Sequence, residues 1–337
     1  MPLLPSSLRA SVLALFLALV AILPAALLPA AAQAEDYPIR IEHAFGTTVI
    51  PARPQRIATV SWSNQEVPLA LGVVPVGFAR ANFGDDDGNG ILPWVEKRLA
   101  ELGAEPPVLF DEGDGIDFEA VAAVQPDVIL AAYSGLSASD YETLSRIAPV
   151  VAYPATPWST GWRDTILMNA RGMGMEAEGK ALVAGLEARI AETRARHPDL
   201  AGRTAMFVTH LSAMDLSRIG FYTDNDTRVQ FFHDLGLTSP PMVKAAAEGG
   251  AFSGEISAER IDDLADVDIL VTYGGRNLLQ KLSTDLLTTQ LPAVARGSLV
   301  MLGNDPMGTA ANPTPLSLPW ILEDYATLLS AALSKAE

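Results

Sequence analysis

Acidic and amide side chains in one short stretch of the chain have the spacing of a calcium-binding loop. Alternate positions of such a loop point to one centre, a glycine at the sixth position allows a sharp turn, and a glutamate at the twelfth closes the site. The matching oxygen donors are Asp85, Asp87, Asn89, Ile91 through its carbonyl, and Glu96. Gly90 stands at the sixth position, but Pro93 is unusual inside such a loop. The stretch is therefore either a structural Ca²⁺ site or a solvated acidic turn.

A second pattern is a phrase that occurs twice without a gap, at residues 116–133 and 256–273. In each copy an acid, Glu119 or Glu259, stands in the first turn of a short predicted helix, and an apolar run then leads to a tyrosine. Either acid alone would stabilise the start of its helix by about 0.3–1 kcal/mol. A matched pair also suits docking onto a partner, because two charges held apart on a rigid frame reach a partner's pockets together only in one arrangement.

The repeat predicts two related α/β lobes, and the rest of the chain supplies the elements that such lobes need. Apolar runs alternate with stretches of helical periodicity, and the short connections favour parallel pairing. In the first lobe the predicted strands cover 56–60, 74–78, 108–110 and 150–153, and the predicted helices cover 64–71 and 138–147. In the second lobe the predicted strands cover 204–209 and 298–302, and the predicted helices cover 227–235, 277–290 and 316–333. A cleft between two lobes is where small ligands usually bind.

Between the lobes lies a helical pattern that is longer than an ordinary helix. It runs from about Ser159 to His197 and is interrupted by Gly172, Gly174 and Gly185. We predict a single long backbone helix that joins the lobes as a stiff spine; two helices split at Gly172 to Gly174 are the alternative. The predicted domains are a cleaved signal peptide over 1–34, an N-terminal lobe over 35–157, the linking helix over 158–198 and a C-terminal lobe over 199–337.

The start of the chain and its composition predict the compartment. Arg9 precedes an apolar run that Pro24 breaks, and Ala32-Gln33-Ala34 offers a cleavage site, which is the pattern of a secretory signal peptide rather than a membrane anchor. The chain has no cysteine, which excludes disulfides, a thiol nucleophile and a lipid anchor on cysteine. Its formal net charge of −17 disfavours nucleic acid as a partner. We predict a periplasmic protein without a lipid anchor.

In this order, the elements resemble the helical-backbone class of periplasmic binding proteins that deliver ferric siderophores, haem or cobalamin to ATP-driven importers. The phrases that carry the resemblance are Arg56-Ile-Ala-Thr-Val60 with Glu66, Leu71-Gly-Val-Val-Pro-Val-Gly77, Phe118-Glu119, Gln125-Pro-Asp127, Ile147-Ala-Pro149, Ser257-Ala-Glu259 and Pro315-Leu-Ser-Leu-Pro-Trp320. The resemblance implies two Rossmann-like lobes with parallel sheets, a ligand cleft between them, no covalent cofactor and a monomer. It also implies that Glu119 and Glu259 dock onto a permease dimer that works with ATPase subunits in the inner membrane.

Ligands of such an architecture lie at the carboxyl ends of the strands, where this chain carries aromatic and basic residues. The predicted ligand-binding residues are Trp62, Arg80, Phe83, Tyr133, Trp158 and Trp162 in the first part of the chain, and His210, Met214, Tyr222, Tyr273, Arg276 and Met307 in the second. A ferric siderophore is large and partly apolar, with oxygens around the metal, so it suits aromatic side chains and a few Arg or Tyr donors.

The charge of this predicted site favours one class of siderophore. Arg80 and Arg276 are its main basic residues, so a neutral or cationic hydroxamate complex fits better than a triply charged catecholate complex. The resemblance implies an arginine before the first repeat in hydroxamate binders, where this chain has the acidic run Asp111-Glu-Gly-Asp-Gly115. That departure favours a cationic ligand, such as a ferrioxamine.

Two other functions stay open from the sequence. A haem or cobalamin binder would keep the fold, with His210 as the axial ligand. An exported α/β hydrolase is disfavoured, because no serine stands in a Gly-x-Ser-x-Gly motif and no other nucleophile setting is recognisable. We therefore predict a binding protein and not an enzyme.

Overall fold

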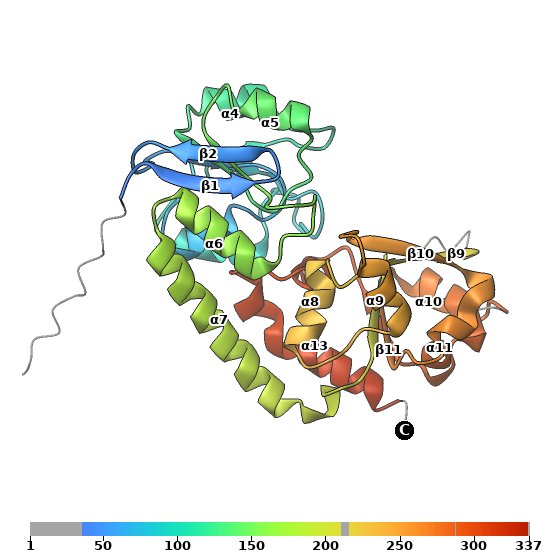
Figure 1. Ribbon diagram of the computed structural model, residues 1–337. Helices are drawn as coiled ribbons and strands as arrows, with labels where there is room; N and C mark the ends of the chain where they lie inside the picture. The colour runs from blue at the N-terminus through green and yellow to red at the C-terminus, as the bar shows by residue number, and fades with distance from the viewer. Residues whose placement is uncertain (1–35, 210–215, 287, 336–337) are drawn as a thin grey trace, which may run out of the picture. The chain divides into compact units, whose positions relative to one another are not determined.

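The computed structural model describes residues 36–209, 216–286 and 288–335 (Figure 1). The predicted signal peptide over 1–34 lies outside this part of the chain. From Tyr37 onward the chain forms one unit, in which each lobe is built around its own five-stranded sheet. Within the described residues, no helix combines the length and the apolar character needed to cross a membrane.

The sheet of the N-terminal lobe is parallel throughout, as predicted. Its strand order is β5-β4-β3-β6-β7, so that β3 lies in the middle and pairs with both β4 and β6. The strands are β3 (Ile57–Thr59), β4 (Gly77–Ala79), β5 (Val108–Phe110), β6 (Val128–Ala131) and β7 (Val150–Ala152). Most of their residues are buried, which matches the near-continuous apolar runs of a parallel sheet covered on both faces.

Short helices and one hairpin complete this lobe. The helices are α2 (Glu66–Ala70), α3 (Pro93–Glu101), α4 (Phe118–Ala123), α5 (Ala138–Leu144) and α6 (Trp162–Gly172). The hairpin of β1 (Ile39–His43) and β2 (Gly46–Ile50) pairs antiparallel and forms its own two-stranded sheet. Ala44 in its turn donates a backbone hydrogen bond to the carbonyl of Tyr153 at 3.0 Å, which attaches the hairpin to the lobe.

The sheet of the C-terminal lobe is mixed, which corrects the prediction of two parallel sheets. Its order is β10-β9-β8-β11-β12, and β9 runs antiparallel to both of its neighbours. The strands are β8 (Ala205–Val208), β9 (Arg218–Tyr222), β10 (Ser253–Ser257), β11 (Ile269–Tyr273) and β12 (Leu299–Leu302). The sequence of β10 is Ser-Gly-Glu-Ile-Ser, with one apolar residue, so its strand signal was too weak to predict.

Helical segments cover this second sheet. They are η1 (Pro198–Leu200), α8 (Thr227–Asp234), α9 (Pro241–Ala247), η2 (Ala258–Leu264), α10 (Arg276–Leu282), η3 (Thr288–Gln290), α11 (Pro292–Arg296), α12 (Pro306–Ala310) and α13 (Ser317–Leu333). The two copies of the repeat occupy equivalent places: β6 lies between β3 and β7, and β11 lies between β8 and β12. The second copy begins with a 3₁₀ segment, η2, kinked at Arg260, in place of the predicted helix.

The predicted single backbone helix over 158–198 is two helices. After α6 ends, Gly174 adopts a left-handed conformation with φ of +67°, and α7 (Glu176–Arg196) begins two residues later. Glycine takes this conformation without the penalty that a Cβ would bring, so the break occurs where the alternative prediction placed it. Since α6 packs on β1, β6 and β7, it belongs to the N-terminal lobe, and α7 alone connects the lobes (Figure 1).

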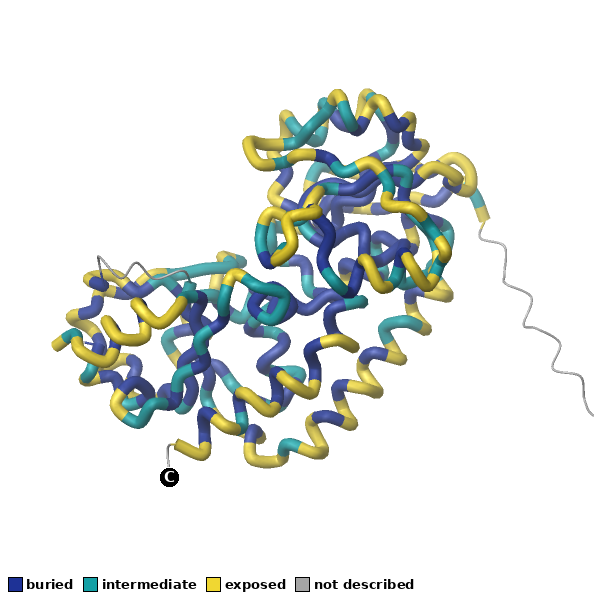
Figure 2. The backbone as a smooth tube through the Cα atoms, turned by 180° about the vertical axis from the view of Figure 1, so that it is seen from behind, coloured by how far each residue is buried: buried dark blue, intermediate teal, exposed yellow. Residues whose placement is uncertain are grey.

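One apolar cluster runs through both lobes. It includes Val67 and Phe78 of the first lobe together with Phe207, Phe231 and Tyr325 of the second. Buried residues line the strands of each sheet and the inner faces of the helices (Figure 2). The lobes are therefore continuous in their packing.

Two glycines of α7 give a test of the contact between α6 and α7. A Cβ at Gly179 would lie 2.5 Å from the Cβ of Ala170 in α6, whereas a Cβ at Gly185 would meet nothing within 4 Å. We expect Gly179→Ala to lower the free energy of unfolding by about 1–3 kcal/mol, because the two helices must move apart. Gly185→Ala should raise it by about 0.5–1 kcal/mol. Urea denaturation measures both, and a stabilising Gly179→Ala would contradict the close approach.

Candidate functional site

The lobes meet at a buried carboxylate on α2. Glu66 is 0% exposed, and its Oε1 accepts a hydrogen bond of 2.8 Å from Trp94 Nε1 of the same lobe. Its Oε2 accepts from the hydroxyl of Thr314 and, at 3.2 Å, from the backbone N–H of Leu316, both next to the start of α13 in the other lobe. Burial raises the pKa of Glu66 to about 7, although the hydrogen bonds from Thr314 and Trp94 oppose this.

Further polar contacts join the lobes. Asn304 accepts a hydrogen bond of 2.7 Å from the backbone N–H of Gly84, where a Cβ would collide with Thr309. Arg163 of α6 forms a salt bridge of 2.9 Å with Asp234 of α8. These contacts fix how the carboxyl edge of the first sheet faces the second lobe.

At that edge, the N-terminal lobe contains a pocket of about 330 Å³. Three of the predicted ligand-binding residues line it: Trp62 after β3, Arg80 after β4, and Trp158. Ser61, Ser63 and Trp158 have φ values of 62°, 59° and 59°, which non-glycine residues adopt rarely. Such backbone conformations gather at ligand sites because the surrounding structure must stabilise them.

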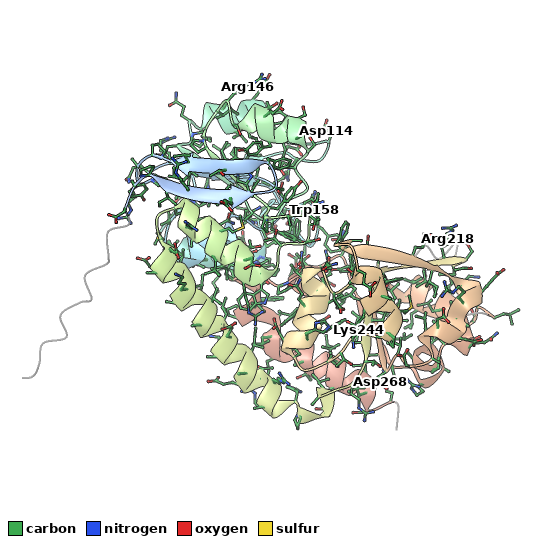
Figure 3. The ribbon with its side chains drawn as sticks, viewed as in Figure 1. Asp114, Arg146, Trp158, Arg218, Lys244 and Asp268 are labelled. Atoms are coloured by element: carbon green, nitrogen blue, oxygen red, sulfur yellow. The ribbon has the colours of Figure 1, made fainter. Side chains whose placement is uncertain are left out.

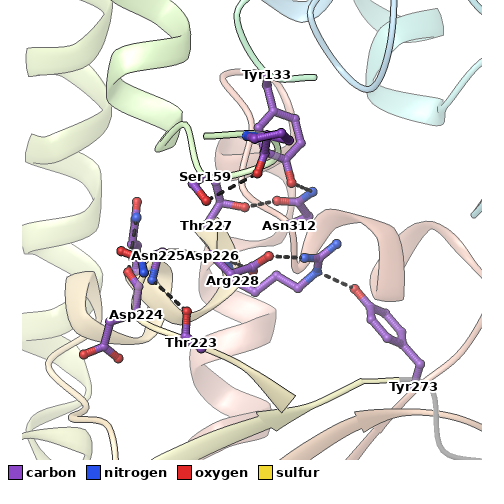
Figure 4. Close-up of polar contacts among 12 residues, drawn as sticks. Tyr133, Ser159, Thr223, Asp224, Asn225, Asp226, Thr227, Arg228, Tyr273 and Asn312 are labelled. Atoms are coloured by element: carbon purple, nitrogen blue, oxygen red, sulfur yellow. Dashed lines mark hydrogen bonds and ion pairs between the residues drawn. The ribbon is translucent and has the colours of Figure 1, made fainter. Parts of the chain in front are cut away.

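The second lobe presents a largely buried arginine, Arg228, whose side chain is 15% exposed, in the first turn of α8 (Figure 4). Its Nη1 donates to Asp226 at 2.7 Å, and its Nε donates to the hydroxyl of Tyr273 at 3.1 Å. The guanidinium lies 4.2 Å from the ring centre of Tyr222. Burial would lower the pKa of Arg228, but the carboxylate of Asp226 outweighs this and raises the pKa above the ordinary value. The arginine therefore stays charged.

Aromatic side chains connect the two surfaces. Phe83 and Tyr273 meet edge to face across the lobe junction, with ring centres 5.5 Å apart. Tyr133 contacts Trp158 in the same geometry at 5.4 Å, and its hydroxyl accepts a hydrogen bond of 3.3 Å from Asn312. Trp158 lies at the side of the N-terminal lobe that faces the second lobe (Figure 3). Seven predicted residues are thus brought to one region: Trp62, Arg80, Phe83, Tyr133, Trp158, Tyr222 and Tyr273.

The remaining predicted ligand residues lie elsewhere or outside the described part. Trp162 is 2% exposed in the core, where its Nε1 donates to Asp234, because α6 turns this side chain inward. Arg276 is exposed at the first position of α10, and Met307 packs against the core from α12. His210 and Met214 lie outside the described residues.

The acidic stretch over 85–96 folds as a turn that satisfies its own oxygens. Asp85 accepts from the backbone N–H groups of Gly88 and Gly90 at 2.9 and 2.6 Å, and Glu96 accepts from the side-chain amide of Asn89 at 2.6 Å. In the described part of the chain, no three His, Cys, Asp or Glu residues are grouped to hold a metal ion. The side-chain amide of Asn89 also donates to Asp87 at 2.9 Å, so the turn is held by its own hydrogen bonds. A calcium site formed by Asp85, Asp87, Asn89, Ile91 and Glu96 stays a prediction, next to the alternative of an acidic turn.

Residues 57–306 match the sequence model described as periplasmic binding protein. The chain belongs to this family. PiaA of Streptococcus pneumoniae TIGR4, solved in complex with ferrichrome, is 41% identical over 89% of this chain and 100% of that chain, with a TM-score of 0.85. A second PiaA structure, described as an iron uptake ABC transporter substrate-binding protein, is 40% identical over 88% of this chain and 100% of that chain, with a TM-score of 0.81.

A curated relative of this periplasmic binding protein is the probable siderophore-binding lipoprotein YfiY of Bacillus subtilis (strain 168). It is 29% identical over 70% of each chain. The names of these relatives describe binding proteins. Burial raises the pKa of Tyr222 to about 12, so its hydroxyl stays protonated, and with Arg228 it can donate hydrogen bonds to oxygen atoms of a ligand.

Two residues of the candidate site in this binding protein are not predicted from its sequence. Arg228 stands on a helix that follows an unpredicted strand, and Asp226-Thr-Arg228 reads as an ordinary helix start. Glu112 lines the N-terminal pocket and was noted only as part of an acidic run. The position of Glu112, two residues beyond the end of the predicted strand over 108–110, is the signal that points to it.

The carboxylate at the lobe junction predicts how stability depends on pH. The unfolded carboxyl group loses its proton near 4.5, while folded Glu66 keeps it to about 7, so the folded state binds more protons between these values. Stability therefore falls as pH rises through this window. We expect the free energy of unfolding of the native protein, relative to Glu66→Gln, to decrease by up to about 3 kcal/mol between pH 4.5 and pH 7. Denaturant titrations across this range measure the free energy of unfolding of both proteins. If the stability of the native protein relative to Glu66→Gln increased with pH, the raised pKa of Glu66 would be contradicted.

Proposed function

We propose that this periplasmic binding protein captures a ferric siderophore of the hydroxamate type between its lobes and delivers it to an ABC importer. The observation that carries the proposal is the 41% identity and TM-score of 0.85 to PiaA, which was solved with ferrichrome. The likeness extends over both lobes, so the two facing surfaces have counterparts in that protein.

The chemistry of the two surfaces supports this class of ligand. Arg228 donates to Asp226 and Tyr273 through Nη1 and Nε, while its Nη2 donates no hydrogen bond to any described residue. That N–H group is available for the oxygen atoms around a ferric ion. Aromatic faces from Trp62, Trp158 and Tyr222 suit the apolar body of the ligand.

Charge supports hydroxamates over catecholates within that class. Three hydroxamate groups cancel the charge of Fe³⁺, whereas a tris-catecholate complex keeps three negative charges. Arg228 is already paired with Asp226, and Arg80 is the one basic residue of the N-terminal pocket. The site therefore has too few positive charges to compensate a triply charged complex for the water that it would lose on binding.

Glu119 and Glu259 are proposed to dock the protein onto its permease. Both are exposed, and neither forms an ion pair or a side-chain hydrogen bond within the described residues. Other side chains already cap the two helical segments: Asp117 accepts from Ala120 N–H at 3.0 Å, and Ser257 accepts from Glu259 N–H at 3.3 Å. The two carboxylates are therefore not needed as caps and are available to arginines of a partner.

We further infer that the protein works in the periplasm as a monomer, next to an inner-membrane permease dimer and its ATPase subunits. The signal-like segment over 1–34 supports export. The relative YfiY is named a lipoprotein, but this chain has no cysteine that could carry a lipid.

Tryptophan fluorescence tests the ligand. We expect ferrichrome and ferrioxamine B to quench the native protein at submicromolar concentration, and ferric enterobactin and haem to leave it unchanged. Trp158→Ala should weaken the binding by about 10- to 100-fold, because a large aromatic contact is lost. Trp320→Ala is the matched control, since this tryptophan is 39% exposed on α13 and lies outside the pocket. Quenching by haem alone would replace the proposal with the haem function.

Uptake by cells tests the docking glutamates. The double variant Glu119→Ala with Glu259→Ala should abolish iron uptake through this protein and leave its affinity for the ligand within about twofold, because neither residue lines the pocket. Glu142→Ala is a control, as another exposed acid on the N-terminal lobe. Uptake that survives in the double variant would contradict the docking role.

A further inference from the structure

A carboxylate lies in the wall of the N-terminal pocket without a positive partner. Glu112 follows β5 and is partly buried, and both of its oxygens accept from the backbone N–H of Ser61, at 3.1 and 3.0 Å. No ion pair joins it to a basic side chain within the described residues. A buried carboxylate without a counter-ion is costly, so such a group commonly marks a functional site.

The charged groups around Glu112 do not compensate it. Arg80 lines the same pocket, but its side chain is exposed and forms no ion pair in the described structure. Asp117 adds to the negative field at Glu112. Asp140 also lines the pocket, and its Oδ2 accepts from the backbone and the hydroxyl of Ser137 at 2.9 and 2.7 Å. Two carboxylates and one exposed guanidinium therefore line the pocket.

An independent feature of the pocket also calls for a hydrogen-bond donor. Gln65 lines it and is 7% exposed, and its Oε1 is buried without a hydrogen-bond partner. Buried acceptors of this kind are rare in folded proteins unless a ligand or water completes them. The pocket thus offers a carboxylate and an amide oxygen, which together suit a group that carries several N–H donors and a positive charge.

We propose that this pocket binds the ammonium end of a cationic ferric hydroxamate, with Glu112 as its counter-ion and Gln65 as a further acceptor. The inference rests on the proposed function and narrows its ligand class. A hydroxamate complex is neutral at the metal, so a primary amine elsewhere in the molecule gives it one positive charge at neutral pH. The oxygens around the iron are then left for Arg228 on the other lobe.

The protonation of Glu112 makes the proposed binding depend on pH. Burial raises the pKa of Glu112 to about 7; the hydrogen bond from Ser61 opposes this, and the charge of Asp117 adds to it. The group becomes a carboxylate as pH rises through this value, whereas a primary ammonium stays charged. Preference for the cationic ligand should therefore strengthen with rising pH.

The experiment compares two probes that differ at this amine: ferrioxamine B, which has a free ammonium group, and its N-acetylated form, which is neutral there and carries one N–H in place of three. Affinities are measured by tryptophan quenching for the native protein, Glu112→Gln and Asp111→Asn. Asp111 is the matched control, because it is an acid one residue away whose side chain is not part of the pocket wall. Glutamine keeps an oxygen that can accept from Ser61.

We expect the native protein to favour ferrioxamine B over the acetylated probe by about tenfold near pH 8, and by less near pH 5.5. Glu112→Gln should remove this preference at both pH values while binding the acetylated probe within about threefold of the native protein. Asp111→Asn should keep the preference.

Three results would overturn the inference. Equal affinity of the native protein for the two probes would do so while leaving the hydroxamate function intact. If the preference for ferrioxamine B survived Glu112→Gln, the general acidity of the protein would explain it instead of Glu112. The same would hold if Asp111→Asn reduced the preference as much as Glu112→Gln does. Failure of both probes to bind, with binding of a catecholate or haem, would instead overturn the proposed function together with the inference.

Discussion

The buried carboxylate of Glu66 is the contact on which the arrangement of the lobes depends. It belongs to α2 of one lobe, and its oxygens accept from Thr314 and Leu316 of the other. A carboxylate that is 0% exposed must have such donors, so separating the lobes would leave it unsatisfied as well as open the apolar cluster around it. The same junction brings Phe83 of one lobe against Tyr273 of the other, and Tyr273 in turn accepts from Arg228.

Much of the fold followed from apolar periodicity. The strands β3, β6, β8 and β11 are buried runs bounded by turn residues, and α8 and α13 carry clear helical spacing, so their positions were predicted within a few residues. The repeat also gave the equivalence of β6 and β11. The reversed strand β9 and the polar strand β10 were missed, because their pairing is decided by neighbours and not by their own composition. The break between α6 and α7 depended on one left-handed glycine, whose conformation the sequence only permits.

Only part of the candidate site could be predicted from the sequence, because some of its residues are placed by strand ends and others by tertiary packing. Residues that follow parallel strands meet at one edge of the sheet, and Arg80 directly after β4 and Trp62 three residues after β3 both line the pocket there. Arg228 lies on a helix, and only tertiary packing against Tyr273 and Tyr222 distinguishes it from a surface arginine. Trp162 shows the opposite error, since an aromatic residue at a suitable place in the chain is turned into the core. The acidic loop has the spacing of a calcium site, but spacing does not determine which N–H groups donate hydrogen bonds to its carboxylates.

Every described residue that lines the pocket of about 330 Å³ belongs to the N-terminal lobe. In evolutionary terms, the loops that line the pocket can vary in sequence while the Arg228 network and the lobe junction remain constant. If this pocket binds the ligand as proposed, substitutions after β3, β4 and β5 would change the ligand without disturbing the Arg228 network or the lobe junction. On the same proposal, a lineage would acquire a new siderophore by altering a few loop residues, while the proposed docking glutamates stay unchanged.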